Sequence, residues 1–274
     1  MRLSDALRIK SGDVVALVGA GGKSTAIRRL VGELTSQVPV IVTSTTKFAL
    51  DQKDLALEHR IIKSRSDLLS ASKHIGTFES LILTGPEDRK EPKWTGLDLN
   101  LINALIYTVR ENGWVLLIEA DGSRGKSLKV PAPYEPVLPL QCDLVVPVVG
   151  LDVIGEICTS DKIHRTELLM KLLNLDLSDR ISTQHVVDLL SSSQGALKGI
   201  PPATPVRVLL NKVASNVDLE NGREIAQGIV KNHRIQSVLL ASAMEEDPVQ
   251  ESITRVAGVI LAAGASTRLH DLKQ

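Results

Sequence analysis

VVALVGAGGKST (residues 14–25) is an apolar run that breaks into glycines and then into a lysine followed by two hydroxyl residues. The apolar run predicts a buried strand, the glycines a tight turn, and the lysine the start of a helix. A glycine-rich turn that opens a helix is the arrangement in which backbone N–H groups cradle a phosphate. The stretch therefore predicts a phosphate-binding loop, and the open alternative is a tight turn whose lysine is solvated.

The same alternation of strands and helices continues along the chain. Short runs that are apolar throughout predict strands covered on both faces, at 13–19, 39–45, 79–85, 114–121, 143–150, 205–211 and 235–242. Amphipathic stretches between them predict helices, among them 23–37, 65–75, 99–112 and 219–232. This order predicts an α/β fold with a doubly wound, mostly parallel sheet of the P-loop NTPase type.

The domain organisation follows from where this alternation is interrupted. Residues 1–245 are expected to form a P-loop-like nucleotide-binding domain, in which 161–194 reads as a wholly helical insertion or a cap over the sheet edge. The polar stretch 246–255 is expected to be a linker. Residues 256–274 begin a new strand-into-glycine pattern, either an edge addition or the start of a second domain.

Composition excludes several classes of partner. Lys plus Arg and Asp plus Glu both total 32, so the formal net charge is zero and nothing favours nucleic acid or an anionic membrane. Two residues each of Trp, Tyr and Phe are too few for a base-stacking platform. No apolar run approaches the roughly 20 residues that span a bilayer, and no signal peptide is visible. We expect a cytoplasmic protein.

The two cysteines, Cys142 and Cys158, are too few for a disulfide scaffold. We expect both to be reduced. A metal site that pairs Cys158 with His164 is a weaker alternative because no second ligand motif accompanies it.

The glycine loop is shorter than the standard phosphate loop. In the standard loop four residues separate the first glycine from Gly-Lys-Ser/Thr, and counting back from Lys23 that position is Leu17. The parts that the chemistry needs are still present: glycines for close backbone approach, Lys23 for the β and γ oxygens, and the Ser24 hydroxyl for Mg²⁺. The loop residues expected to hold phosphates are Gly19, Gly21, Gly22, Lys23, Ser24 and Thr25.

Carboxylates end the predicted strand 114–121. Glu119 and Asp121 would lie at the carboxyl edge of the sheet, where phosphate-loop proteins hold Mg²⁺ or position water. We expect Asp121 to share the metal with Ser24, and Glu119 to be its outer partner or a general base. Arg124 and Lys126, with Lys129, would meet a second anion. The alternative for Asp121-Gly122 is a plain turn.

Hydroxyls and a lysine end the predicted strand 39–45. Among residues 43–47, Thr46 and Lys47 are expected to sense a γ-phosphate or metal, unless the hydroxyls cap a helix. VLLNKVAS (208–215) contains Asn211 and Lys212 of the Asn-Lys-x-Asp base-reading element, with Ala214 in place of the guanine-reading aspartate. His164 and Arg165 head a helix that could close over a site or be ordinary structure.

GAGGKST, VTSTTK, IEADGSRGKSLKVPAPYEP, VVGLDVIGE and LLNK occur in this order, and with them the sequence resembles the YqeC family over about residues 10–245. The resemblance implies a cytoplasmic phosphate-loop domain. It implies an accessory role in maturing selenium-dependent molybdenum hydroxylases or their molybdopterin cofactor, so a molybdenum hydroxylase and molybdopterin are the implied partners.

LAAGASTRLHDLK (261–273) resembles the opening of MobA/MocA-type nucleotidyltransferases, which attach CMP or GMP to molybdopterin. Gly264, Ser266, Arg268 and Lys273 match the triphosphate-binding pattern, and His270 stands where the pattern has glycine. The resemblance implies that 256–274 begin a truncated nucleotidyltransferase-like domain.

These observations together predict a nucleotide-binding, Mg²⁺-dependent NTPase-like accessory factor that takes ATP or GTP. Positioning and charge neutralisation would lower the hydrolytic barrier. A small-molecule phosphotransferase, a non-hydrolysing assembly module, and a cytidylyl- or guanylyltransferase in the full-length protein remain alternatives.

Overall fold

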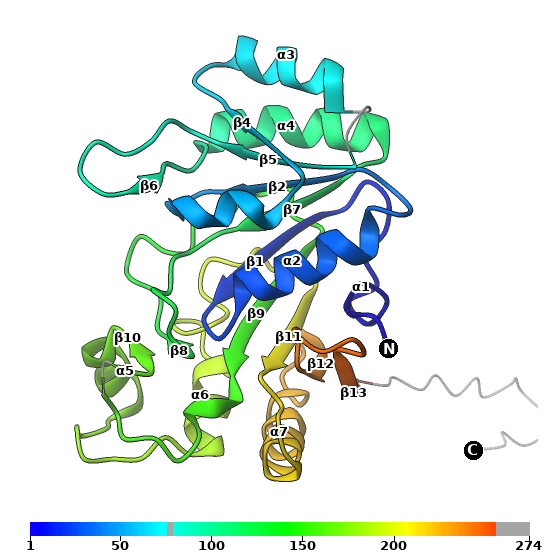
Figure 1. Ribbon diagram of the computed structural model, residues 1–274. Coiled ribbons are helices and arrows are strands. Elements are labelled where there is room, and N and C mark those ends of the chain that lie inside the picture. The colour runs from blue at the N-terminus through cyan, green and yellow to red at the C-terminus, as the bar shows by residue number, and fades with distance from the viewer. Residues whose placement is uncertain (76–78, 160, 256–274) are drawn as a thin grey trace, which may run out of the picture.

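A computed structural model describes residues 1–75, 79–159 and 161–255. Its centre is a nine-stranded sheet in the order β13-β12-β11-β9-β1-β7-β2-β5-β4 (Figure 1). The strands are β1 (Val14–Gly19), β2 (Val40–Ser44), β4 (Glu58–Ile61), β5 (Ser80–Thr84), β7 (Val115–Glu119), β9 (Leu144–Gly150), β11 (Val206–Asn211), β12 (Ile235–Ala241) and β13 (Val249–Thr254). Every pairing in this sheet is parallel except that of β13 with β12.

The apolar strands form where the sequence predicts them. All seven predicted runs are strands of this sheet, and the expectation of a mixed α/β fold with a large, mostly parallel sheet is confirmed. Two further strands lie at the sheet edges: β4, and β13 inside the range 246–255 that was expected to be a linker. The division into domains stays a prediction, and residues 256–274 lie outside the described residues.

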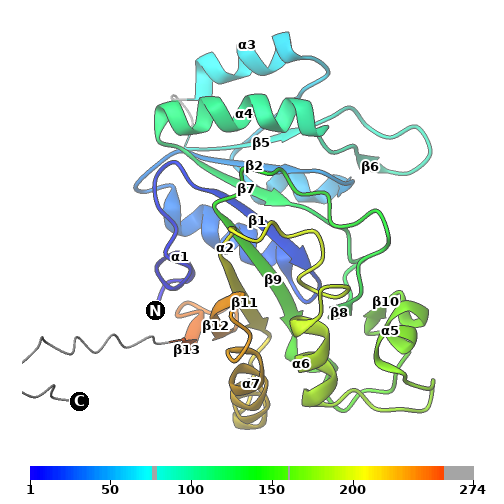
Figure 2. The same ribbon diagram turned by 180° about the vertical axis from the view of Figure 1, so that it is seen from behind.

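Helices cover both faces of the sheet (Figures 1 and 2). We call one side the α2-side core; it is covered by α1 (Leu3–Ala6), α2 (Lys23–Leu34) and the 3₁₀ helix η1 (Leu50–Leu55). The other is the α4-side core, covered by α3 (Arg65–Ile75), α4 (Leu99–Asn112), α6 (Thr183–Ser191) and α7 (Asn216–Ile229). Strand β1 serves both cores, because alternate side chains of a strand point to opposite faces.

The insertion is not wholly helical, which corrects the expectation for 161–194. It begins with strand β10 (Ile163–His164), which pairs with β8 (Leu128–Lys129) before α5 (Thr166–Leu173) starts. Helix α6 then packs beside α7 on the α4-side core. The two-residue strand is too short for a periodic pattern, and its partner lies about 35 residues away in sequence.

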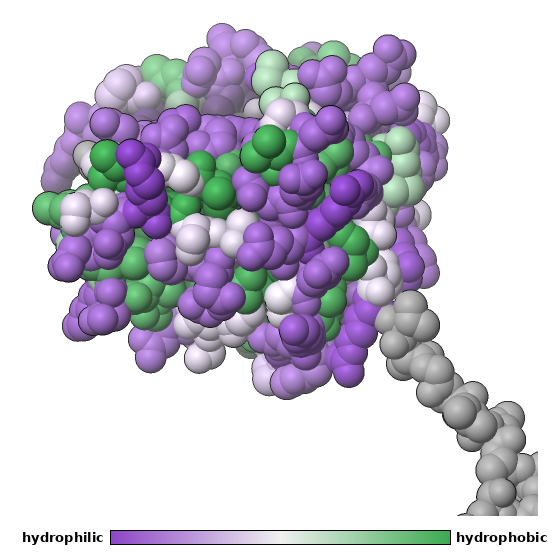
Figure 3. Space-filling model, turned by 90° about the horizontal axis from the view of Figure 1, so that it is seen from below, coloured by the Kyte–Doolittle hydropathy of each residue, from purple (hydrophilic) through white to green (hydrophobic). Residues whose placement is uncertain are grey.

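The remaining short elements are β3 (Phe48–Ala49), which pairs antiparallel with β6 (Lys93–Trp94), and the 3₁₀ helix η2 (Leu151–Val153). Viewed from below, the surface is mostly hydrophilic with hydrophobic residues scattered among the polar ones (Figure 3). None of the helices in the described ranges has the length and apolar character needed to cross a membrane.

Candidate functional site

The glycine loop between β1 and α2 needs its glycines. Gly19, Gly21 and Gly22 all have positive φ, of 89°, 92° and 112°. A Cβ on Gly21 would lie 2.0 Å from the backbone nitrogen of Gly150, the last residue of β9. The loop is therefore seated directly on the neighbouring strand, where no side chain fits.

The N–H groups of this loop fall into two sets. The first three are already bonded: Gly19 N–H to the Asp121 carboxylate, Ala20 N–H to Val148 O at 2.9 Å and Gly21 N–H to Lys126 O at 2.8 Å. For the N–H groups of residues 22–25 the described part of the chain offers no acceptor. These four groups begin α2, and an anion would therefore bind at the helix start.

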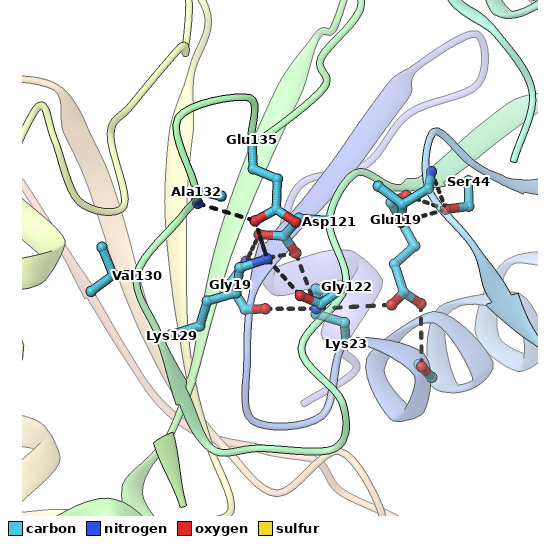
Figure 4. Close-up of polar contacts among 12 residues, drawn as sticks. Gly19, Lys23, Ser44, Glu119, Asp121, Gly122, Lys129, Val130, Ala132 and Glu135 are labelled. Carbon is cyan, nitrogen blue, oxygen red and sulfur yellow. Dashed lines mark hydrogen bonds and ion pairs between the residues drawn. The ribbon is translucent and has the colours of Figure 1, made fainter. Parts of the chain in front are cut away.

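Lys23 lies buried between the loop and two carboxylates (Figure 4). Its Nζ donates to Gly19 O at 2.6 Å and lies 3.1 Å from Asp121 Oδ1 and 3.8 Å from Glu119 Oε1. The helix start, the lysine and both carboxylates thus share one small region at the carboxyl edge of the sheet.

Ser24 contacts Glu119 at the end of β7. Ser24 Oγ donates to Glu119 Oε2 at 3.2 Å, and Gln52 Nε2 donates to the same two oxygens, at 2.6 Å and 3.3 Å. Burial raises the pKa of Glu119, and the nearby Lys23 opposes that rise. Gln52 was missed by the sequence reasoning, because its position in η1 carries no local signal for a contact 67 residues away.

Both carboxylate oxygens of Asp121 are already occupied by donors from the protein. Gly19 N–H lies 3.1 Å and 2.9 Å from its two oxygens, and the ammonium groups of Lys23 and Lys129 each lie 3.1 Å away. The structure shows no hydrogen bond between Asp121 and Ser24, a pair of described residues expected to share a metal. The side chain that the fold brings to Ser24 is Glu119.

The charges continue away from the loop as an ion-pair chain. From Asp121 it passes to the buried Lys129, then to Glu135 at 2.7 Å and on to Arg165, whose two terminal nitrogens lie 2.6 Å and 3.0 Å from the Glu135 oxygens. Bonds from Arg165 and Lys129 overcome the burial of the Glu135 carboxyl and lower its pKa to about 2. Glu135 lies in the PYEP stretch of the resemblance, but no role had been assigned to it.

The hydroxyl of Ser44, the last residue of β2, forms hydrogen bonds with the backbone at the end of the strand. Ser44 Oγ donates to Glu119 O at 2.7 Å and accepts from Thr46 N–H at 2.9 Å. Lys47 pairs with Asp88 at 3.0 Å. The alternative of a capped helix start is wrong, since β3 follows at Phe48.

Asn211 holds the back of the glycine loop. Its Nδ2 donates to Gly21 O at 2.8 Å, and its Oδ1 accepts from Ala243 N–H at 2.9 Å. Lys212 does not contact the loop through these bonds: its Nζ donates to Ser127 Oγ at 2.8 Å and pairs with Asp152 at 3.1 Å. The structure places Asn211 beneath the loop with both ends of its amide engaged.

Several predicted residues line a cleft of about 790 Å³ that opens beside the end of β7. The lining residues include Thr46, Lys47, Gly122, Arg124, Lys126, His164 and Arg165. Lys129 was expected to join Arg124 and Lys126, but it is fully buried and faces Asp121 and Glu135 instead. Gly264, Ser266, Arg268 and Lys273 lie outside the described residues.

Both cysteines are free, as expected, and the structure shows that both are also buried. Burial raises the pKa of Cys142 to about 12. Within the described ranges no group of three or more His, Cys, Asp and Glu could hold a metal ion. A cation site here would therefore need a hydroxyl or ligand oxygens as well as a carboxylate.

The chain matches known proteins over most of its length. A family model described as "YqeC protein" matches residues 15–167, more than half of the chain, from β1 to the first residues of α5. The chain is also 24% identical over 237 residues to a protein of Escherichia coli (strain K12) described as "Uncharacterized protein YqeC". That match covers 86% of this chain and 90% of the other protein.

Proposed function

The chain belongs to the YqeC family, and from this premise we propose that it binds the phosphates of a nucleoside triphosphate at the start of α2. We propose further that it acts as an Mg²⁺-dependent, NTPase-like accessory factor in maturing molybdenum hydroxylases or their molybdopterin cofactor, as the resemblance implies. The observation that carries the first proposal is that Lys23, Ser24 and Glu119 meet at a helix start whose first N–H groups have no acceptor among the described residues.

The helix start suits a phosphate in charge and in hydrogen bonding. The N–H groups of residues 22–25, which no described residue accepts from, would donate to phosphate oxygens, and the helix dipole favours an anion there. Lys23 Nζ is bonded to a neutral carbonyl, Gly19 O, which a phosphate oxygen could replace. Asp121 would keep Lys23 in place during the exchange.

Ser24 and Glu119 fit a magnesium ion. A serine hydroxyl and a carboxylate at 3.2 Å are hard oxygen donors, and Mg²⁺ commonly takes one or two protein ligands with phosphate and water. A bound Mg²⁺ would neutralise charge on the phosphates. Gln52 Nε2 donates to both oxygens, so Gln52 would have to move aside. Asp121 has no oxygen left over for this role.

The sheet order supports a P-loop type of domain, with one departure. Strand β7, which carries Glu119, lies directly beside β1, which leads into the loop. The first three N–H groups of the loop are bonded internally, so we propose that the phosphate is held at the helix start and not wrapped by the loop. This accounts for a loop that is two residues shorter than the standard one.

A binding module without turnover is the second candidate. Both carboxylates near the helix start are held by protein donors: Glu119 by Ser24 and Gln52, and Asp121 by Gly19 and two lysines. In this arrangement both oxygens of Asp121 are occupied, and Glu119 Oε1, 3.8 Å from Lys23 Nζ, is the oxygen of the pair left to take a proton from water. Such limited means of activating water favour binding over rapid turnover.

Calorimetric titration with ATP, GTP and CTP in the presence of Mg²⁺ tests the proposal. We expect micromolar binding by the wild type, at least about tenfold weaker binding by Lys23→Ala, and loss of the Mg²⁺ dependence in Ser24→Ala. Lys231→Ala is the matched control, because Lys231 is exposed and far from the site in sequence. No heat with any of the nucleotides would overturn the proposal.

Two further readouts complete this experiment. Circular dichroism shows whether Lys23→Ala is folded. If it is not, Ser24→Ala still tests the site, because this substitution removes no charge. Phosphate release measured on the wild type separates hydrolysis from a binding module. The preferred base identifies the nucleotide.

A further inference from the structure

The cleft beside the end of β7 is a separate feature from the start of α2. The segment 122–126 lies between them: Lys126 O accepts from Gly21 N–H in the loop, while the Lys126 side chain lines the cleft. The opposite wall is built from β10 and the first residues of α5. A volume of about 790 Å³ is large enough for a small-molecule ligand.

Five of the residues that line the cleft are cationic. They are Lys47, Lys93, Arg124, Lys126 and Arg165, beside the imidazole of His164 and the carboxylates of Glu135 and Glu167. Lys47, Lys93 and Arg165 are neutralised by carboxylates. Arg124 and Lys126 have no carboxylate partner among the described residues, and Lys126 Nζ donates only to Asp161 O, at 3.1 Å. The positive charges of Arg124 and Lys126 are thus available to a ligand, partly offset by the Glu167 carboxylate in the same lining.

The start of α5 adds unused hydrogen-bonding groups on the same wall. Thr166, the first residue of this eight-residue helix, lines the cleft and is only 6% exposed. Its Oγ1 is buried without a hydrogen-bond partner, which is costly in a folded protein. The N–H groups of Thr166 and Glu167 likewise have no acceptor in the part of the chain that the structure describes.

The backbone is bent to bring these groups together. Arg165, which precedes α5, has a φ of 64°, and Arg124 has a φ of 52°. Residues other than glycine rarely adopt such positive values. His164 reports the resulting field: burial, together with Arg165, Lys129 and Arg124, lowers its pKa to about 4. Burial disfavours a charge of either sign, but the contribution of Arg165, Lys129 and Arg124 reflects a positive potential, which favours an anion.

We propose that this cleft binds a second small molecule through a phosphate or carboxylate group placed at the start of α5. The N–H groups of Thr166 and Glu167 and the Thr166 hydroxyl would donate to its oxygens, and Arg124 and Lys126 would neutralise its charge from the facing wall. The proposal goes beyond nucleotide binding at α2 and does not depend on it.

Two probes test the site: pyrophosphate for a phosphorylated ligand and citrate for a carboxylated one. Each is titrated into the wild type and into Lys23→Ala, in which the proposed nucleotide site is impaired. We expect millimolar or tighter binding of at least one probe, of similar strength in both proteins. The probe that binds more tightly, pyrophosphate or citrate, identifies the ligand class. If neither probe binds at millimolar concentration, the proposal is overturned.

Substitutions in the cleft place the probe. We expect binding to weaken about tenfold in Arg124→Gln and about threefold in Thr166→Val, which removes one hydroxyl at nearly constant volume. Arg28→Gln, on the exposed side of α2, is the control and should bind as the wild type does. The ring resonances of His164 should shift when the probe binds. Unchanged affinity in both cleft variants would contradict the site even if a probe binds.

This design separates the two proposals. Failure of nucleotide binding at α2 leaves probe binding to Lys23→Ala as evidence for the cleft. If the cleft binds neither probe, nucleotide binding at α2 is still tested, because Arg124→Gln should then bind ATP or GTP as the wild type does.

Discussion

At the scale of single residues, five alternating charges connect the glycine loop with the start of α5. Lys23, Asp121, Lys129, Glu135 and Arg165 follow one another with gaps of 2.6–3.1 Å, and Figure 4 shows the first four together. Four of them are buried, so each charge relies on its neighbours to offset the cost of leaving water. Loss of one member would leave an unpaired buried charge.

Glu135 should make the free energy of unfolding depend on pH in the acidic range. Its pKa in the folded protein, about 2, lies below the ordinary value of 4.5, so the unfolded chain binds more protons between these values. The stability that Glu135 contributes is therefore full above about pH 4.5 and is lost as the pH falls toward 2. In Glu135→Gln the free energy of unfolding should fall less steeply over this range, with a difference of roughly 2 kcal/mol.

Urea unfolding followed by circular dichroism at several pH values between 6 and 3 measures this difference. Other carboxyl groups titrate in both proteins and cancel in the comparison. Parallel curves for the wild type and the variant would show that Glu135 is not held ionised by Lys129 and Arg165.

At the scale of elements, the glycine loop depends on its contact with β9. Gly12 and Gly21 have nearly the same φ, 87° and 92°, but a Cβ on Gly12 would meet nothing within 4 Å, whereas a Cβ on Gly21 would overlap Gly150 and Val149. Gly12→Ala should thus cost only the backbone strain, about 1 kcal/mol. Gly21→Ala should cost a further 2–3 kcal/mol or so, because the loop must leave β9.

Thermal unfolding of the two alanine variants compares these costs, and nucleotide titration shows whether the displaced loop still presents the start of α2. Equal melting temperatures for the two variants would mean that β9 does not constrain the loop. Because the two φ angles nearly match, the comparison separates the cost of the close contact with β9 from the cost of a positive φ.

The elements that sequence reasoning missed share a physical cause. Strand β4 reads EHRI and lies at the sheet edge, so its charged residues hide it from a search for apolar runs. Strand β13 reads VQESIT and lies at the opposite edge; residues on one of its faces are buried or half-buried and those on the other are exposed. Seven central strands were predicted because both of their faces are buried and leave a continuous apolar run.

At the scale of the whole molecule, the two cores share one sheet. Strand β1 sends Val14, Ala16 and Val18 into the α4-side core and Val15 and Leu17 into the α2-side core. Loss of one core would strip the cover from strands that the other core also needs. The described part of the chain is therefore expected to unfold as a unit.

The two tryptophans can test this, because they lie on opposite sides. Trp114 belongs to the α4-side core, and Trp94 packs against the α2-side core. In Trp94→Phe the remaining Trp114 reports on the α4-side core, and in Trp114→Phe the remaining Trp94 reports on the α2-side core. The fluorescence midpoint in urea should coincide with that from circular dichroism in both variants, and a separation in either would show that the two sides unfold independently.

By itself the sequence determined the central strands, the main helices and the place of the glycine loop, because these depend on local periodicity and turn chemistry that neighbouring residues carry. It also placed Glu119 and Lys23 at one edge of the sheet, since parallel strands end together. The tertiary structure alone decided which side chains meet: Ser24 with Glu119 and not Asp121, and Gln52 with both. Asn211 reaches the loop across 190 residues, and pairing over such a distance depends on how the elements pack, which no local pattern encodes.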